Sequence, residues 1–187
     1  MTVDQLRAAF ASTRGVLVAV TADQLDQPTP CASWTVRDLI DHLVGISFWS
    51  AETISTGVAP EQPPTGYADG DFVAAFDDGI AATLAACDTP GAFDGTVRLP
   101  FGEFPAVRFL GLATTDPFVH GWDLAKATGQ PTDLDPVLAE QLLTQARASI
   151  PDTFRGPDGT APFGPIVDVP AGAPPADQLA GFLGRNP

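Results

Sequence analysis

Apolar residues recur at helical spacing in several blocks of this chain. The clearest block runs from Asp71 to Cys87, and its apolar side chains follow at steps of three and four: Phe72, Ala75, Phe76, Ile80 and Leu84. This spacing places one apolar stripe along one side of a helix. The block therefore predicts an amphipathic helix whose stripe packs against other helices.

Capping patterns and turn residues set the other boundaries. Thr35 with Asp38 resembles a capping box, so Thr35 is the expected N-cap of a helix that runs to about Thr56. Further helices are expected at residues 3–24, 107–128 and 135–149, with a short one at 176–183. The segment 57–70 is rich in proline and predicts a loop, and 88–107 predicts a short hairpin or an extended crossover.

These elements predict an all-α fold. The helix at 107–128 is apolar nearly all round, which is typical of a central helix. Long amphipathic helices with one long connection indicate a four-helix bundle with a long crossover, plus an extra C-terminal helix and an irregular tail. We expect residues 1–150 to form the bundle domain and the Pro/Gly-rich residues 151–187 to pack on that same domain.

Charge and composition exclude several partners. The 187 residues carry a formal net charge of −14, and one Lys and eight Arg form no basic run. Nucleic acid and anionic membrane surfaces are therefore not expected as partners. The sequence also has no leader pattern and no apolar stretch near the roughly 18 residues of a membrane span, so we expect a cytoplasmic protein. Cys31 and Cys87 lack metal-binding CxxC spacing and predict small, partly buried side chains.

The chain contains only two histidines, and both fall in predicted helices. His42 shares a helix face with Leu39, Ile46 and Trp49, so its imidazole is expected to point inward. Such a histidine is either a core residue with a hydrogen-bond partner or a metal ligand. The tryptophans, Trp49 included, are expected mainly to pack the core.

His120 has a carboxylate on each side of it along its helix. Asp116 precedes it by four residues and Asp123 follows it by three, on an otherwise apolar surface. A divalent metal held by His42, Asp116 and His120 satisfies these groups, and two imidazoles with one carboxylate suit zinc, nickel or iron(II). The alternative is that Asp116 and Pro117 begin a helix, as N-cap and first residue, in which case no metal binds there.

Two further aspartates have alternative roles. Asp123 could orient an imidazole through its second nitrogen, or it could form a structural bond to Arg108 or to a backbone amide. For Asp38 the two alternatives are to orient an imidazole or to cap a helix.

Several segments of the chain resemble a known family. They are Pro28 to Leu39, His42 to Gly45, Asp116, Val119 to Ala125 and Gly129, with Pro162 to Gly164, Ala173 to Pro174 and Gly184 to Pro187 in the tail. In this order they resemble the DinB-like metal-binding proteins, in particular short actinobacterial members related to the N-terminal domain of mycothiol-dependent maleylpyruvate isomerase. Together they extend over nearly the whole chain.

The resemblance implies a DinB-like four-helix bundle with metal ligands at His42, Asp116 and His120. The family commonly has Glu or His where this chain has Asp116, and Pro117 departs from an unbroken helix. Characterised relatives use the metal to activate a low-molecular-weight thiol, mycothiol or bacillithiol, for isomerisation or S-transfer, and relatives often form dimers. The isomerase has a further C-terminal domain that this sequence lacks, so maleylpyruvate isomerisation itself is not expected.

The leading hypothesis is therefore a divalent-metal-binding protein, most simply a zinc protein, that acts as a thiol-dependent transferase or isomerase-related metalloenzyme. Its partners are a mycothiol-type thiol and an electrophilic small molecule, and a homodimer is compatible. The first alternative is a non-catalytic metal- or ligand-binding bundle. The second is an iron oxygenase, which the helical spacing of the ligands disfavours because those sites usually lie on strands.

Overall fold

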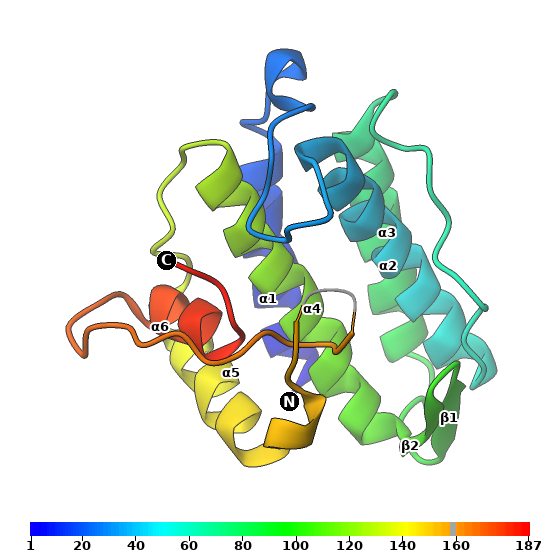
Figure 1. Cartoon of the computed structure of the whole chain (residues 1–187). Helices are drawn as coiled ribbons and strands as arrows, with labels where there is room; N and C mark the ends of the chain where they lie inside the picture. Colours follow the sequence, from blue (N-terminus) through cyan, green and yellow to red (C-terminus); the bar gives the residue numbers. More distant parts are fainter. Residues whose placement is uncertain (158–159) are drawn as a thin grey trace.

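The fold is mostly helical, as a computed structural model of the chain shows (Figure 1). The structure describes residues 1–157 and 160–187. Within these residues it contains six α-helices and one two-stranded sheet: α1 (Val3–Leu17), α2 (Val36–Thr56), α3 (Phe72–Cys87), β1 (Thr96–Leu99), β2 (Gly102–Pro105), α4 (Ala106–Ala127), α5 (Pro136–Ser149) and α6 (Pro175–Phe182). Two short 3₁₀ turns, η1 (Ala22–Gln24) and η2 (Asp152–Phe154), complete the elements. In the described part of the chain, no helix is long and apolar enough to cross a membrane.

The beginning and end of α2 follow the sequence signals. Thr35 accepts the backbone N–H of Asp38, and the Asp38 carboxylate accepts the backbone N–H of Thr35 at 2.9 Å. This reciprocal pair is the expected capping box, and it satisfies two amides that the first turn leaves free. The helix ends at Gly57, whose φ of 73° is the left-handed conformation that glycine adopts without a steric penalty.

The first helix is shorter than the block 3–24 predicted. It ends at Leu17, and the separate turn η1 follows after Thr21, whose backbone is extended. Gln24 closes a second capping box on Thr21, so the local hydrogen bonds favour a new short helix over continuation of α1. The expectation of one unbroken helix was wrong for this reason.

Residues 88–107 contain the predicted hairpin. β1 and β2 pair antiparallel, with Val97 opposite Phe104, and Gly102 supplies a positive φ of 141° at the turn. Val97 and Leu99 face the core, while the alternate residues are exposed. The chain then enters α4 directly from β2, so the hairpin sets where α4 begins.

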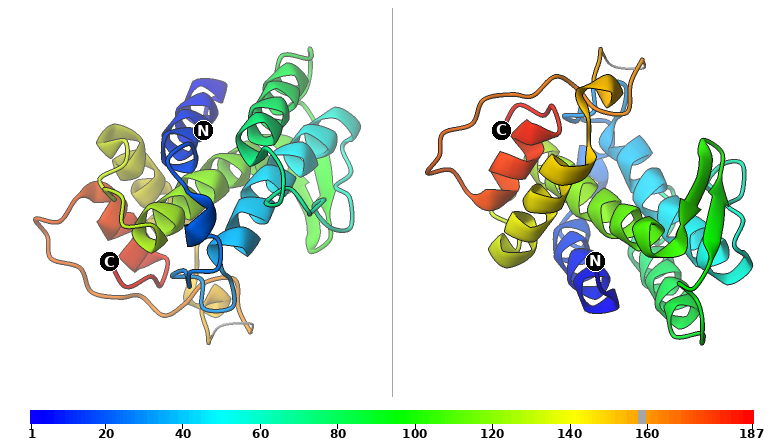
Figure 2. Two further views of the ribbon diagram at one scale, coloured as in Figure 1. Left: turned by 90° about the horizontal axis from the view of Figure 1, so that it is seen from above. Right: turned by 90° about the horizontal axis from the view of Figure 1, so that it is seen from below.

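Helix α4 crosses the middle of the molecule, as the views from above and below show (Figure 2). It packs against α1 on one side and α2 on the other, while α3 packs against both α1 and α2. Phe10 of α1, Phe76 of α3 and Phe109 of α4 are almost completely buried in this core. The central place of α4 agrees with its nearly continuous apolar sequence.

The C-terminal segment packs against the other side of α4. Helix α6 contacts α5 and α4, and Trp122 of α4 donates its indole N–H to Asp177 of α6 at 2.8 Å. Arg155, before the last long loop, donates to the carbonyl of Phe182 at 2.7 Å and stacks over its ring. These contacts hold the end of the chain beside the C-terminal part of α4.

Candidate metal centre

His42 of α2 and Asp116 of α4 meet where these two helices face each other. Nε2 of His42 lies 3.0 Å from Oδ1 of Asp116. Both side chains keep about a fifth of their surface exposed, 19% for His42 and 22% for Asp116. The pair is therefore held inside the fold but remains reachable from solvent.

His120 completes this group from the next turn of α4. Its Nε2 lies 3.8 Å from Oδ2 of Asp116, and the rings of His42 and His120 meet edge to face with centroids 4.6 Å apart. One potential ligand atom from each of the three residues lies within 4.8 Å of the others. The tertiary structure thus brings together all three residues that the sequence analysis selected.

Asp116 lies in the middle of α4, with Pro117 inside the helix. The alternative in which these two residues begin a helix was therefore wrong. Pro117 has no N–H and cannot bond the carbonyl four residues earlier. Thr13 of α1 donates its hydroxyl to the carbonyl of Pro117 at 2.7 Å, so α1 stabilises α4 next to the site.

Asp123 lies on the other side of the His120 ring. Its Oδ2 is 3.0 Å from Nδ1 of His120, and its side chain is completely buried. Arg185 pairs with it through Nε to Oδ1 at 3.2 Å and Nη2 to Oδ2 at 3.0 Å. Of the roles considered for Asp123, contact with an imidazole is the one observed, and its structural partner is Arg185 rather than Arg108.

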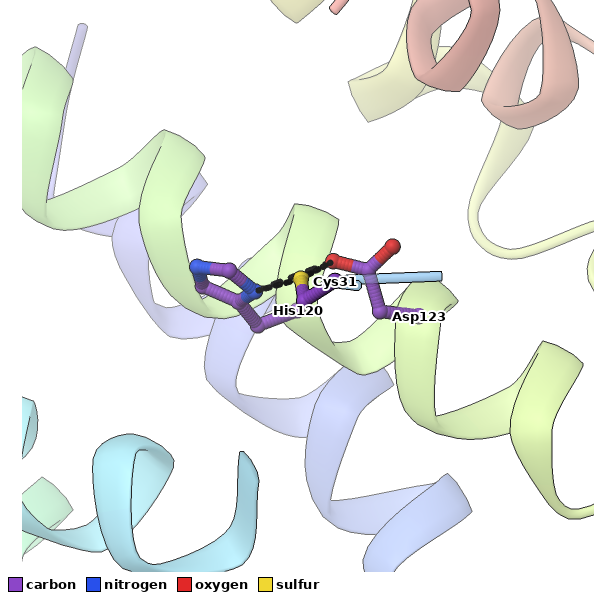
Figure 3. A group of neighbouring side chains, drawn as sticks. All are labelled: Cys31, His120 and Asp123. Carbon is purple, nitrogen blue, oxygen red and sulfur yellow. Dashed lines mark hydrogen bonds and ion pairs between the residues drawn. The ribbon is translucent and has the colours of Figure 1, made fainter. Parts of the chain in front are cut away.

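Cys31 adds a second group of potential ligands around the same histidine (Figure 3). Its thiol donates to Oδ2 of Asp123 at 3.2 Å, and its Sγ lies 3.7 Å from Nδ1 of His120. Nη2 of Arg185 lies 3.8 Å from the same sulfur. Because a guanidinium already supplies the positive charge here, this second group is the weaker candidate for a metal cation.

Burial and neighbouring charges act in opposite directions on these groups. Burial raises the pKa of Asp116, but the charges of His42 and His120 outweigh it and lower this pKa to about 2. Burial likewise opposes the hydrogen bond from His120 and the charge of Arg185, which lower the pKa of Asp123 to about 2. Both carboxyls are therefore ionised at neutral pH.

Asp116 and Asp123 also shift the pKa values of the groups beside them, His42 and Cys31. Burial lowers the pKa of His42, but the charge and hydrogen bond of Asp116 raise it more, and the result is a raised pKa. Burial, together with the charge of Asp123, raises the pKa of the Cys31 thiol to about 12. Cys31 is thus a protonated hydrogen-bond donor at neutral pH and a poor nucleophile.

Trp34 covers one side of the two imidazoles. Its ring centroid lies 4.8 Å from that of His42 and 5.4 Å from that of His120. Trp34 is partly buried at the edge of the core, whereas Trp49 and Trp122 are buried in it, as expected. Asp38 caps α2 through Thr35, so the capping alternative describes this residue.

Sequence reasoning missed three neighbours of the site: Cys31, Trp34 and Arg185. Cys31 and Trp34 lie just before α2, and Arg185 lies after α6. No periodic spacing relates these positions to the histidines, because separate loops bring them there. The only available signal was their presence within the segments that carry the family resemblance.

Comparison with known proteins agrees with this resemblance. Residues 6–125 match the family model described as the mycothiol maleylpyruvate isomerase N-terminal domain, which confirms the DinB-like relation. Two uncharacterised proteins from two strains of Mycobacterium tuberculosis are each 46% identical over 182 residues, which cover 95% of this chain and 92% of each relative. No solved structure matches the chain. The chain therefore belongs to the family of the mycothiol maleylpyruvate isomerase N-terminal domain.

Proposed function

We propose that the chain is a divalent-metal-binding protein that uses His42, Asp116 and His120 as ligands. The observation that carries this proposal is the convergence of Nε2 of His42 and Nε2 of His120 on the two carboxylate oxygens of Asp116. Two imidazoles and a carboxylate suit zinc best, with nickel and iron(II) as alternatives. On this proposal, α1 to α4 are the DinB-type four-helix bundle that presents the ligands.

The charges of the three groups favour a cation at this place. Asp116 is ionised, and in the described part of the chain the only ion pairs that it forms are those to the two histidines. Asp123 differs, because Arg185 neutralises it directly. A cation therefore gains more electrostatic stabilisation beside Asp116 than beside Asp123.

The protein would use such a cation to activate a small thiol. A bound divalent metal lowers the pKa of a coordinated thiol or water and so provides a nucleophile at neutral pH. Cys31 does not serve this role itself, because its pKa of about 12 keeps it protonated. The family relation makes a mycothiol-type thiol the proposed cosubstrate, with an electrophilic small molecule as the acceptor. The protein would act as a cytoplasmic, homodimeric transferase or isomerase-related metalloenzyme.

Metal analysis of protein purified without an affinity tag tests the binding proposal. We expect about one equivalent of zinc per chain, or saturable uptake of zinc, nickel or iron(II) by metal-free protein. His42→Ala and His120→Ala should each lower the affinity strongly, and Asp116→Ala tests the third ligand. Absence of bound metal together with no uptake by the wild-type protein contradicts the proposal.

A separate assay tests catalysis. The metal-loaded protein is incubated with mycothiol and a panel of electrophiles, and thiol conjugates are measured by mass spectrometry. We expect conjugates with the wild-type protein and none with His120→Ala. A protein that binds metal but forms no conjugate across the panel is instead a non-catalytic binding module.

A further inference from the structure

We infer that Arg185 is a positioning residue for His120 and acts on it through Asp123. The inference rests on the proposed metal function, because it concerns which nitrogen of His120 is available to the metal. It assigns a role in the site to the segment that follows α6, which lies outside residues 6–125 that match the family.

The Asp123 carboxylate receives donors from three segments of the chain. Oδ1 accepts from Nε of Arg185, and Oδ2 accepts from Nη2 of Arg185, from Nδ1 of His120 and from the thiol of Cys31. Every one of these contacts lies between 3.0 and 3.2 Å. The carboxylate is completely buried, and these hydrogen bonds satisfy its oxygens and fix its position.

This arrangement selects one tautomer of His120. An ionised carboxylate can only accept hydrogen bonds, so Nδ1 of His120 must carry the proton that it donates to Asp123. A neutral imidazole then has its free electron pair on Nε2. Nε2 is the nitrogen that lies toward Asp116, so the ligand electron pair points into the proposed metal centre.

Among the donors that the structure describes around Asp123, Arg185 is the one whose positive charge does not depend on pH. A buried carboxylate needs a partner, and the guanidinium of Arg185 supplies one in direct contact with the buried Asp123 side chain. Its two parallel contacts also fix the orientation of the carboxylate plane. Cys31 adds a neutral and weaker donor.

Hydrogen bonds and a close backbone contact hold Arg185 in its position beside Asp123. The amide of Arg185 donates to the carbonyl of Ala180, and Nη1 donates to the carbonyl of Leu183. Gly184 has a φ of 92°, and a Cβ there would lie 2.5 Å from Cα of Gly164. Two loops therefore cross in direct backbone contact just before Arg185, which places the guanidinium beside α4.

Three variants separate the positioning role from general docking of this segment. Arg185→Met removes the ion pair, and Arg185→Lys keeps a charge without the paired geometry. Arg155→Met is the matched control, because Arg155 holds the same segment through Phe182 and Gly164 but does not contact Asp123. Circular dichroism and thermal unfolding of each variant check that it is folded.

Competition titration with a zinc chelator measures the first expected result. Loss of a residue that orients a metal-ligating histidine typically costs roughly 10–100-fold in affinity. Because Arg185 acts on His120 through Asp123, we expect Arg185→Met to lose zinc affinity near the lower end of this range, roughly tenfold, Arg185→Lys to recover part of it and Arg155→Met to stay near wild type. Equal losses in Arg185→Met and Arg155→Met, or no loss in either, overturn the inference.

The tautomer of His120 is measured without any metal. Long-range proton–nitrogen NMR resolves the two imidazoles of the chain, and His42→Gln assigns the remaining signals to His120. At a pH where both rings are neutral, we expect the proton of His120 on Nδ1 in the wild type and in Arg155→Met, and a shift toward Nε2 in Arg185→Met. An unchanged tautomer in Arg185→Met overturns the inference.

Zinc binding and the tautomer of His120 test the proposed function and the role of Arg185 independently. A wild-type protein that binds no metal contradicts the proposed function, while the tautomer of the metal-free variants still decides the role of Arg185. A wild-type protein that binds zinc, with Arg185→Met unchanged in both affinity and tautomer, leaves the proposed function standing and removes the positioning role.

Discussion

His42 and Asp116 are 74 positions apart in the chain, yet Nε2 of the one lies 3.0 Å from Oδ1 of the other. This contact joins α2 to α4 at a place where both side chains keep about a fifth of their surface exposed. It exists only because α2 and α4 pack with these two side chains turned toward each other. The proposed metal centre is thus a property of the helix packing, and a ligand bound there connects two central helices.

Zinc should stabilise the folded protein through this connection. A ligand that binds only the folded state adds about 2.7 kcal/mol when its free concentration is 100 times its Kd. We expect zinc to raise the Tm of the wild type and to leave the Tm of His42→Ala nearly unchanged. Differential scanning calorimetry with and without zinc checks this, and a similar rise in both proteins would place the zinc elsewhere.

Zinc affinity should decrease as the pH falls. The pKa of His42 is raised by Asp116, so the imidazole holds its proton to a higher pH than an ordinary histidine. A protonated imidazole cannot bind metal, and zinc must displace that proton. Titration in buffers of different ionisation enthalpy should therefore show proton release on binding. Binding that is independent of pH below neutrality speaks against His42 as a ligand.

The metal-free protein should lose stability in acid through two carboxyls of the site, the partly exposed Asp116 and the buried Asp123. Asp116 and Asp123 each have a pKa of about 2 in the folded protein, below the roughly 3.9 of an unfolded aspartate. Their contribution is fully present above the unfolded value and is lost as the pH falls from about 4 toward 2. Urea unfolding across this range measures the loss, and Asp123→Asn should show a shallower dependence.

His42 should give the opposite dependence at higher pH. Because the folded-state pKa of His42 is raised, its contribution is complete below the unfolded value of roughly 6.5 and is lost as the pH rises through the folded value. Stability of the metal-free wild type should therefore decline on the alkaline side of neutrality relative to His42→Ala. Parallel stability curves for the two proteins contradict this expectation.

Trp34 should report on the metal centre by fluorescence. Its ring lies within 5.4 Å of both imidazole centroids, so cobalt(II) or nickel(II) bound beside them should quench its emission. Trp34→Phe should remove most of the response, because Trp49 packs on Phe109 and donates to the Pro60 carbonyl instead. Trp49→Phe is the matched control and should keep the quenching. The opposite pattern shows that the metal binds elsewhere.

Two glycine substitutions should have opposite effects on stability. At Gly121, next to His120, a Cβ would lie 2.5 Å from Oγ1 of Thr13 and 3.2 Å from its Cα, so α1 and α4 must separate. We expect Gly121→Ala to destabilise the protein by about 1–3 kcal/mol. Gly15 in α1 has open space, and Gly15→Ala should stabilise it by about 0.4–1 kcal/mol. Chemical denaturation measures both, and equal effects contradict the close contact of α1 and α4.

Most of the helical elements could be predicted from the sequence. The capping box of Thr35, the left-handed glycine after Thr56 and the apolar stripe of α3 are local signals, and each acts within a few residues. The end of α1 was missed because the apolar pattern continues to Val20, although the capping-box spacing of Thr21 and Gln24 was a local signal for a new short helix. The hairpin could be predicted only as one of two options, since its weak alternation leaves the pairing open.

The sequence by itself determined the helices, their apolar faces and the selection of His42, Asp116 and His120. It could do so because helical periodicity and capping depend on neighbours within about one turn. Only the tertiary structure decided that Asp116 lies inside α4, that Cys31 and Trp34 lie beside the histidines, and that Arg185 pairs with Asp123. The contact of Cys31 with His120 spans 89 positions and that of Arg185 with Asp123 spans 62, so the packing of whole helices and loops determines them rather than any local pattern.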